Sequence, residues 1–220
     1  ELDGGVAELE TSTLAKGSHT VRAVYLSETQ NFVTSTSAVV DHQVNRADTT
    51  TTVESSAQVA VFGQAVTVRA TVAVTAPGAG APTGTLTFSD GGTVIGTATV
   101  DSSTDFTGSV TVDDLTVGQH VITVEYDGDD DFAPSSGTVV QKVQRAQTSV
   151  VVGSSANSSQ SGNPVAFTAT VDPVAPGAGE PTGTVRFTVN GANLGGPVQV
   201  VDGRATSIEF SSLSPGTYRV

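Results

Sequence analysis

The 220-residue sequence contains no cysteine, no methionine and no tryptophan. Without cysteine, the chain can form neither disulfide bonds nor a thiolate zinc site, and it has no thiol nucleophile. Aromatic residues make up only 5% of the chain. The hydrophobic core must therefore be built mainly from valine, alanine, isoleucine and leucine, with a few phenylalanines.

Basic residues are also scarce. Nine Lys and Arg residues stand against 22 Asp and Glu, which gives a formal net charge of −13 and a pI near 4.3. An acidic surface of this kind repels phosphate backbones, so nucleic acid is not expected as a partner. No apolar run approaches the length needed to cross a bilayer, so we expect no membrane span in this stretch of sequence.

What the sequence does contain is a stretch that occurs three times. It runs from Leu115 to Phe132, has an earlier copy from Leu14 to Phe32, and begins a third time at Leu213. Each copy reads Leu-x-x-Gly-x-(His or Tyr), and the two complete copies continue with alternating apolar and polar residues, which predicts a strand with one buried face. The residues expected to face inward are His19, Val21, Ala23 and Tyr25 in one copy and His120, Ile122, Val124 and Tyr126 in the other.

His19 and His120 stand where the third copy has Tyr218. In immunoglobulin-like sandwiches, a tyrosine at this corner hydrogen-bonds back to the backbone. A histidine that alternates with tyrosine between copies is predicted to brace the corner rather than bind a metal or act as a base. The third histidine, His42, has no partner that the sequence names. We therefore predict no catalytic histidine.

Serine pairs and unmatched aromatics are the other candidates for a site. Ser154-Ser155 and Ser158-Ser159 lack a Gly-x-Ser-x-Gly elbow and are predicted to be turns. Phe62 and Phe106 have no aromatic counterpart in the third copy, so both are expected to be exposed and could stack on a sugar. Isolated exposed aromatics are common and need no functional explanation. With no catalytic set in view, we predict that the chain is not an enzyme.

The repeat spacing predicts the domain organisation. Pro82-Thr83-Gly84 recurs as Pro181-Thr182-Gly183, a spacing of 99 residues that is typical of immunoglobulin-like domains. The junction Val44-Asn45-Arg46-Ala47 recurs at residues 143–146 without Pro, Gly or Ser, so the junctions are expected to be stiff. The predicted segments are 1–46, the C-terminal part of one repeat; 47–145, a complete repeat; and 146–220, the N-terminal part of another.

Alternation also places the strands. The predicted inner faces are Val66, Val68, Ala70, Val72, Leu86 and Phe88 in the complete repeat and Val165, Phe167, Ala169, Val171, Val185 and Phe187 in the next. Further strands are expected near residues 93–100 and 106–112, and in the first segment over 6–10, 14–25 and 38–44. Asp90-Gly91 and Asn190-Gly191 are predicted to be hairpin turns, because such dipeptides accept positive φ. The pattern predicts an all-β chain of tandem immunoglobulin-like Greek-key β-sandwiches, one complete and two partial.

The motifs as a set resemble a known family. Pro-Thr-Gly-Thr-(Leu/Val)-x-Phe, Leu-x-x-Gly-x-(His/Tyr)-x-Val and Tyr126-Asp127-Gly128-Asp129 with Phe132 and Ser135 look like the bacterial immunoglobulin-like repeat of the group 3 kind. In that family a Tyr-x-Gly-Asp-x-x-Phe-x-x-Ser signature closes the penultimate strand, and the first copy departs from it because Tyr25 to Phe32 lacks the Gly-Asp pair. The resemblance implies an extracellular or cell-surface location in a large bacterial protein.

The acidic run after Tyr126 has two interpretations. Carboxylates at the alternating positions Asp127, Asp129 and Asp131 resemble part of a calcium loop, and calcium is the one cofactor that the sequence suggests. No glutamate follows at the distance that an EF-hand needs. Gly-Asp is equally ordinary turn chemistry. Both a calcium site and a structural turn stay open.

Two functions fit these observations. The chain can be a non-catalytic spacer or stalk whose partners are the neighbouring immunoglobulin-like repeats of the same chain. The alternative is an adhesin module that binds a host protein or glycan through end loops near Pro77 to Pro82. The identity of residues 76–80 with residues 175–179 favours a shared structural role, because recognition loops would be free to differ. A further possibility is that residues 1–46 of one chain complete the third segment of another.

Overall fold

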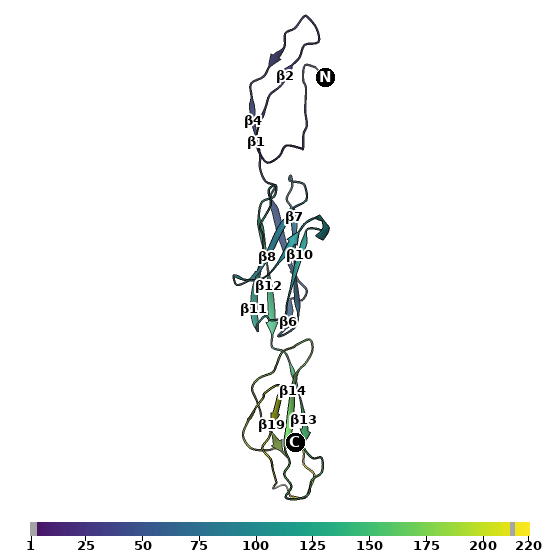
Figure 1. Cartoon of the computed structure of the whole chain (residues 1–220), viewed down its shortest axis with the longest axis vertical. Helices are drawn as coiled ribbons and strands as arrows, with labels where there is room; N and C mark the ends of the chain where they lie inside the picture. Colours follow the sequence, from purple (N-terminus) through teal and green to yellow (C-terminus); the bar gives the residue numbers. More distant parts are fainter. Residues whose placement is uncertain (1–3, 212–213) are drawn as a thin grey trace. The chain divides into compact units, whose positions relative to one another are not determined.

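The computed structural model describes residues 4–211 and 214–220. Within these residues the secondary structure consists of strands and one short 3₁₀ helix, η1 (Ser102–Thr104) (Figure 1). The predicted all-β class is confirmed. No helix in the described part of the chain is long and apolar enough to cross a membrane. Leu213, where the third corner motif begins, lies outside the described residues.

Backbone proximity groups the chain into two compact units. One contains residues up to 54 with 69–110 and 122–139, and the other contains 55–68, 111–121 and 140–220. The division into three segments at the repeat junctions stays a prediction. The names first segment, middle repeat and third segment are used below for residues 1–46, 47–145 and 146–220.

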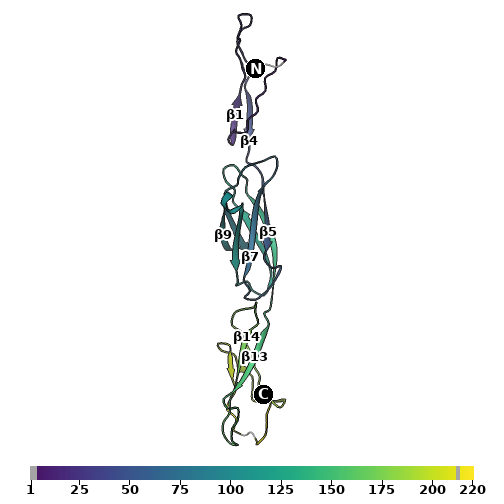
Figure 2. The same cartoon turned by 90° about the vertical axis from the view of Figure 1, so that its right-hand side faces the viewer.

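The middle repeat is a sandwich of two sheets (Figure 2). Its strands are β5 (Thr49–Ser55), β6 (Val59–Val61), β7 (Val66–Val74), β8 (Gly84–Asp90), β9 (Thr93–Val100), β10 (Thr107–Val112), β11 (Gly118–Tyr126) and β12 (Ser135–Gln144). One sheet has the order β10-β7-β5 and the other the order β6-β12-β11-β8-β9. β6 runs parallel to β12, whereas β8 is antiparallel to both β9 and β11.

The core of the middle repeat follows the predicted alternation. The four inner residues of β7 are at most 2% exposed, and those of β8 and the last three of β11 at most 1%. They are Val66, Val68, Ala70 and Val72, then Leu86 and Phe88, then Ile122, Val124 and Tyr126. Each large apolar side chain buried in this way contributes about 1.5–3 kcal/mol to folding.

One of the two hairpin predictions is confirmed and the other is shifted by one residue. Asn190 and Gly191 both have positive φ and join β16 (Thr188–Val189) to β17 (Ala192–Asn193). At the corresponding turn of the middle repeat, between β8 and β9, the residues with positive φ are Gly91 and Gly92, while Asp90 is still paired in the ladder. The repeat spacing of 99 aligns Asn190 with Gly91, so the Asp-Gly dipeptide was placed one residue too early.

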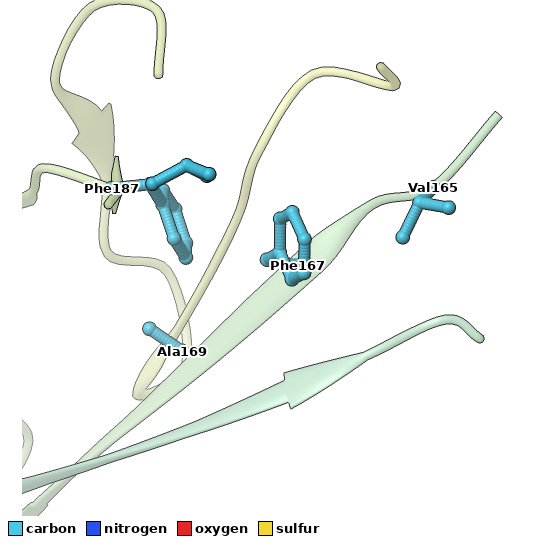
Figure 3. Packing of buried hydrophobic residues seen from close by; sticks show 5 residues of the cluster. Val165, Phe167, Ala169 and Phe187 are labelled. Carbon is cyan, nitrogen blue, oxygen red and sulfur yellow. The ribbon is translucent and has the colours of Figure 1, made fainter. Parts of the chain in front are cut away.

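The third segment has a smaller core. β13 (Thr148–Ser154), β14 (Phe167–Pro173) and β19 (Arg204–Thr206) form one sheet, and β15 (Thr184–Val185) pairs with β18 (Val198–Gln199). A cluster of buried residues lies on this framework, comprising Val165, Phe167, Ala169, Phe187 and Val189 (Figure 3). The predicted inner residues of this region are buried, except that Val185 is half-buried at the margin of the cluster.

The first segment departs most from prediction. It consists of β1 (Gly17–Val21) paired with β4 (Val40–Val44) and β2 (Val24–Tyr25) paired with β3 (Ser35–Thr36). The strand predicted over 6–10 does not form beyond a single bridge residue, Val6, and the strand predicted over 14–25 starts at Gly17 and is interrupted at 22–23. Apolar residues here are exposed, Leu9 by 87% and Tyr25 by 37%. Alternation alone does not hold a strand when no second layer covers its apolar side.

Candidate functional site

The candidate site is the loop between β11 and β12, residues 127–134, which we call the Asp129 loop. Its centre is the half-buried carboxylate of Asp129. One oxygen, Oδ1, accepts the backbone amides of Asp131 and Phe132, each at 2.8 Å. The other, Oδ2, accepts the amide of Thr83 at 2.9 Å and its hydroxyl at 2.8 Å. Asp129 therefore closes its own loop and ties that loop to the start of β8.

Two neighbours of Asp129 hold the same strand. Asp127 Oδ1 accepts the amide of Thr85 at 2.9 Å. The ring of Tyr126 is buried, and its hydroxyl donates to the carbonyl oxygen of Thr83 at 2.6 Å. Charged acceptors make stronger hydrogen bonds than neutral ones, so the carboxylates of Asp127 and Asp129 fix the start of β8 against the Asp129 loop.

The environment shifts the pKa values of both central groups. Burial alone would raise the pKa of Asp129, but the hydrogen bonds from Thr83, Asp131 and Phe132 outweigh it and hold that pKa below its ordinary value. Burial raises the pKa of Tyr126 to about 12, and the nearby Asp129 and Asp127 carboxylates add to the effect. At neutral pH the site thus contains an anionic Asp129 and a neutral tyrosine hydroxyl.

The last two residues of the signature also have structural partners. Phe132 is 6% exposed, and its ring covers Gly80, where an added methyl group would lie 2.9 Å from the ring Cζ. The hydroxyl of Ser135 lies 2.8 Å from the hydroxyls of both Thr49 and Thr51 in β5. The tyrosine, aspartate, phenylalanine and serine of the Tyr-x-Gly-Asp-x-x-Phe-x-x-Ser signature therefore each contact another part of the middle repeat.

The structure places the three predicted calcium ligands in one loop but gives them different roles. Asp129 accepts four hydrogen bonds and Asp127 accepts one, whereas the side chain of Asp131 is exposed. Among the described residues, no group of three or more acidic or histidine side chains could hold a metal ion. The contacts shown are those of a structural turn, and calcium binding by Asp127, Asp129 and Asp131 stays a prediction.

The corner prediction is confirmed in all three copies. His19 Nε2 lies 2.6 Å from the carbonyl oxygen of Ala15, and His120 Nε2 lies 2.8 Å from that of Thr116. The hydroxyl of Tyr218 donates to the carbonyl oxygen of Ser214 at 2.7 Å. In each copy the ring bonds the residue four positions earlier, so histidine and tyrosine are interchangeable braces here. These contacts give the histidines a structural task.

The remaining candidates do not assemble into a site. Phe62 is 39% exposed, as expected, but Phe106 is half-buried at a residue with positive φ. The hydroxyl of Ser154 donates to the carbonyl oxygen of Ala156, which is ordinary turn chemistry. Among the described residues, no hydrogen bond joins Ser154 to a histidine.

Thr83 and Thr85 are site residues that the sequence interpretation missed. Both belong to the Pro-Thr-Gly-Thr motif, from which the sequence indicated the repeat spacing and the family resemblance but no role in a site. The available signal was that this motif and the Gly-Asp pair occur together in the complete repeat. Two motifs 40 or so residues apart are expected to meet when their strands are neighbours, as β8 and β11 are.

A family model described as "Bacterial Ig-like domain (group 3)" matches residues 50–144 and again residues 152–220, which together are well over half of the chain. No curated protein matches the sequence. Among solved structures, the chain is similar to the fibronectin(III)-like modules of CbhA from Clostridium thermocellum, with 17% identity over 74% of this chain and 80% of that chain and a TM-score of 0.30. We infer nothing from a likeness at that level.

Proposed function

Because the chain belongs to the group 3 family of bacterial immunoglobulin-like domains, we propose that it is a non-catalytic spacer or stalk segment of a large extracellular or cell-surface bacterial protein. Domains of this family are typical of bacterial surface proteins, and immunoglobulin-like modules are generally structural. The proposed partners are the neighbouring repeats of the same chain. Its acidic surface, with a formal charge of −13, favours solubility and disfavours anionic partners.

The observation that supports this proposal is how the signature residues are used. Asp129, the residue with the most hydrogen bonds in the candidate site, has both oxygens occupied by donors of its own repeat. Tyr126 and Phe132 are buried. A binding or catalytic site needs groups directed at a ligand, whereas these groups are directed at the fold.

The adhesin alternative depends on the end loops near Pro77 to Pro82. Pro82 is buried, and Thr83 beside it is bonded to Asp129, so this end of the loop has a structural task. The spacer function is therefore favoured over recognition by this loop. Binding on a glycan array that disappears when residues 77–81 are replaced would reverse this preference.

Small-angle scattering tests the spacer function. A compact globule of 220 residues has a radius of gyration of about 17 Å. Tandem modules that act as a spacer are expected to give a clearly larger radius of gyration. Their pair-distance distribution should have a long tail beyond its most frequent distance. A radius near that of the compact globule, unchanged by dilution, would contradict the proposal.

A further inference from the structure

The residue at which the chain enters the middle repeat is held by the Asp129 loop. Ala47 is half-buried and forms an isolated parallel bridge with Phe132. Its amide donates to the carbonyl oxygen of Asp131 at 2.8 Å, and its own carbonyl oxygen accepts the amide of Ala133 at 2.8 Å. Ala47 is thus bonded through both backbone groups to the loop that the carboxylate of Asp129 closes.

The loop of residues 76–80, which we call the Pro-Gly loop, lies against the side chain of Ala47. A methyl group added to Gly78 would lie 2.7 Å from Cβ of Ala47, far inside contact distance. The residue before the loop holds the next residue of the junction, because the amide of Thr75 donates to the carbonyl oxygen of Asp48 at 2.8 Å. The φ of Gly78 is outside the left-handed region, so glycine is needed here for space alone.

The same arrangement recurs 99 residues later, within the second compact unit. Ala146 is half-buried, and a methyl group added to Gly177 would lie 2.5 Å from its Cβ. The amide of Val174 donates to the carbonyl oxygen of Gln147 at 2.7 Å. These contacts match those of Ala47, Gly78, Thr75 and Asp48 one for one. The identity of the two loops therefore follows from a shared contact with a junction alanine.

We propose that the Pro-Gly loop and the Asp129 loop together form a socket whose occupant is the incoming chain, namely the last residue of the preceding repeat and the junction alanine that follows it. This inference rests on the spacer function and deepens it, because a seated junction fixes the chain where a flexible linker would let it swing. Arg46 adds a side-chain contact, with Nε donating to the carbonyl oxygen of Asp130 at 3.3 Å. The absence of Pro, Gly and Ser from residues 44–47 agrees with an ordered junction.

The test is amide hydrogen exchange by NMR on the full chain carrying Gly78→Ala. The added methyl group displaces Ala47, so the amides of Ala47 and Ala133 should exchange at least about tenfold faster. The amides of Phe88 and Val124, in the core strands, should be unchanged. Adding Ala47→Gly to the variant removes the opposing methyl group and should restore slow exchange.

Two matched variants complete the design. Gly196→Ala is the control, because an added methyl group there meets no atom within 4 Å and φ is outside the left-handed region. Gly177→Ala repeats the experiment at the second junction and should speed exchange of the Val174 amide. Unchanged exchange at Ala47, or acceleration shared equally with Phe88, would overturn the socket. A compact scattering profile together with local acceleration at Ala47 would instead reject the spacer function and keep the socket.

Discussion

The stretch from Tyr126 to Phe132 and its earlier copy from Tyr25 to Phe32 begin and end with the same residue types but make different contacts. In the middle repeat Tyr126 is 1% exposed and Phe132 is 6% exposed. Asp129, which lies between them in the sequence, accepts the amide of Phe132. In the first segment Tyr25 is 37% exposed and Phe32 67% exposed. There the turn is closed locally, by the Ser27 hydroxyl donating to the carbonyl oxygen of Thr29.

The difference shows that the signature residues stabilise their loop only where a second segment of the repeat supplies their hydrogen-bond partners. Asp129 stabilises its loop because Thr83 presents an amide and a hydroxyl to it from another part of the repeat. The same residue offers a carbonyl oxygen to the hydroxyl of Tyr126, so the polar end of this buried ring has a hydrogen-bond partner. The first copy lacks the Gly-Asp pair and, among the described residues, any segment that supplies the role of Thr83. If these contacts determine stability, substitutions in the two loops should differ in their effect on the free energy of unfolding.

The largest expected difference is between the two tyrosines. Tyr126→Ala should lower the free energy of unfolding of the middle repeat by about 3–5 kcal/mol, because it empties a buried aromatic site. Tyr25→Ala should cost under about 1 kcal/mol, since its ring is partly exposed already. Urea denaturation measures both, followed through the amide signals of Phe88 and Val124 for Tyr126→Ala and through those of Thr20 in β1 and Asp41 in β4 for Tyr25→Ala. Equal costs would mean that burial does not separate the two loops.

Alternation of apolar and polar residues predicted the strands correctly in the two-sheet sandwich of the middle repeat. It predicted strands wrongly in the first segment, where the apolar side chains are exposed. Period-two alternation identified the buried face of β7, because each inner valine there meets a second sheet. The same kind of pattern around Leu9 gave no strand, since a strand is held by its neighbours as much as by its own sequence. For the site, the sequence singled out the Gly-Asp pair and the acidic run around it. Thr83 was not predicted as the partner of Asp129, because a single sequence does not say which strands pair.

The second difference concerns the carboxylate itself. Asp129→Ala should lower the free energy of unfolding of the middle repeat by about 1–3 kcal/mol, since it leaves the donors of Thr83, Asp131 and Phe132 without their charged acceptor. Asp131→Ala is the matched control, because its side chain is exposed, and should change stability by less than about 0.5 kcal/mol. The same urea experiment compares them. A loss at Asp131 as large as that at Asp129 would show that the acidic run acts by its charge alone.

The third difference is in pH dependence. The pKa of Asp129 is lowered in the folded state, so its stabilisation is present above the ordinary carboxyl pKa of about 3.9 and is lost as the pH falls through the lowered value. The pKa of Tyr126 is raised to about 12, so its contribution is complete below about pH 10 and is lost as the pH rises towards 12. Asp129→Asn should flatten the acid limb of the stability profile, and Tyr126→Phe the alkaline limb. Limbs that persist in these variants would assign the titration to other groups.

The smallest expected effect is that of calcium, and it bears on the same contrast. For Asp129 to coordinate a calcium ion, the ion would have to compete with four hydrogen bonds that the carboxylate already accepts, and Asp131 would have to turn inward from solvent. We therefore expect millimolar calcium to raise the melting temperature of the chain by less than about 1 °C, since a ligand that binds the folded state stabilises it only as far as its concentration exceeds its dissociation constant. Calorimetry of the unmodified chain and of Asp131→Ala makes the comparison. A rise of several degrees that Asp131→Ala abolishes would make the loop a calcium site, and would mean that the Gly-Asp pair, which the first segment lacks, gives the middle repeat a bound ion as well as the hydrogen bonds of Asp129.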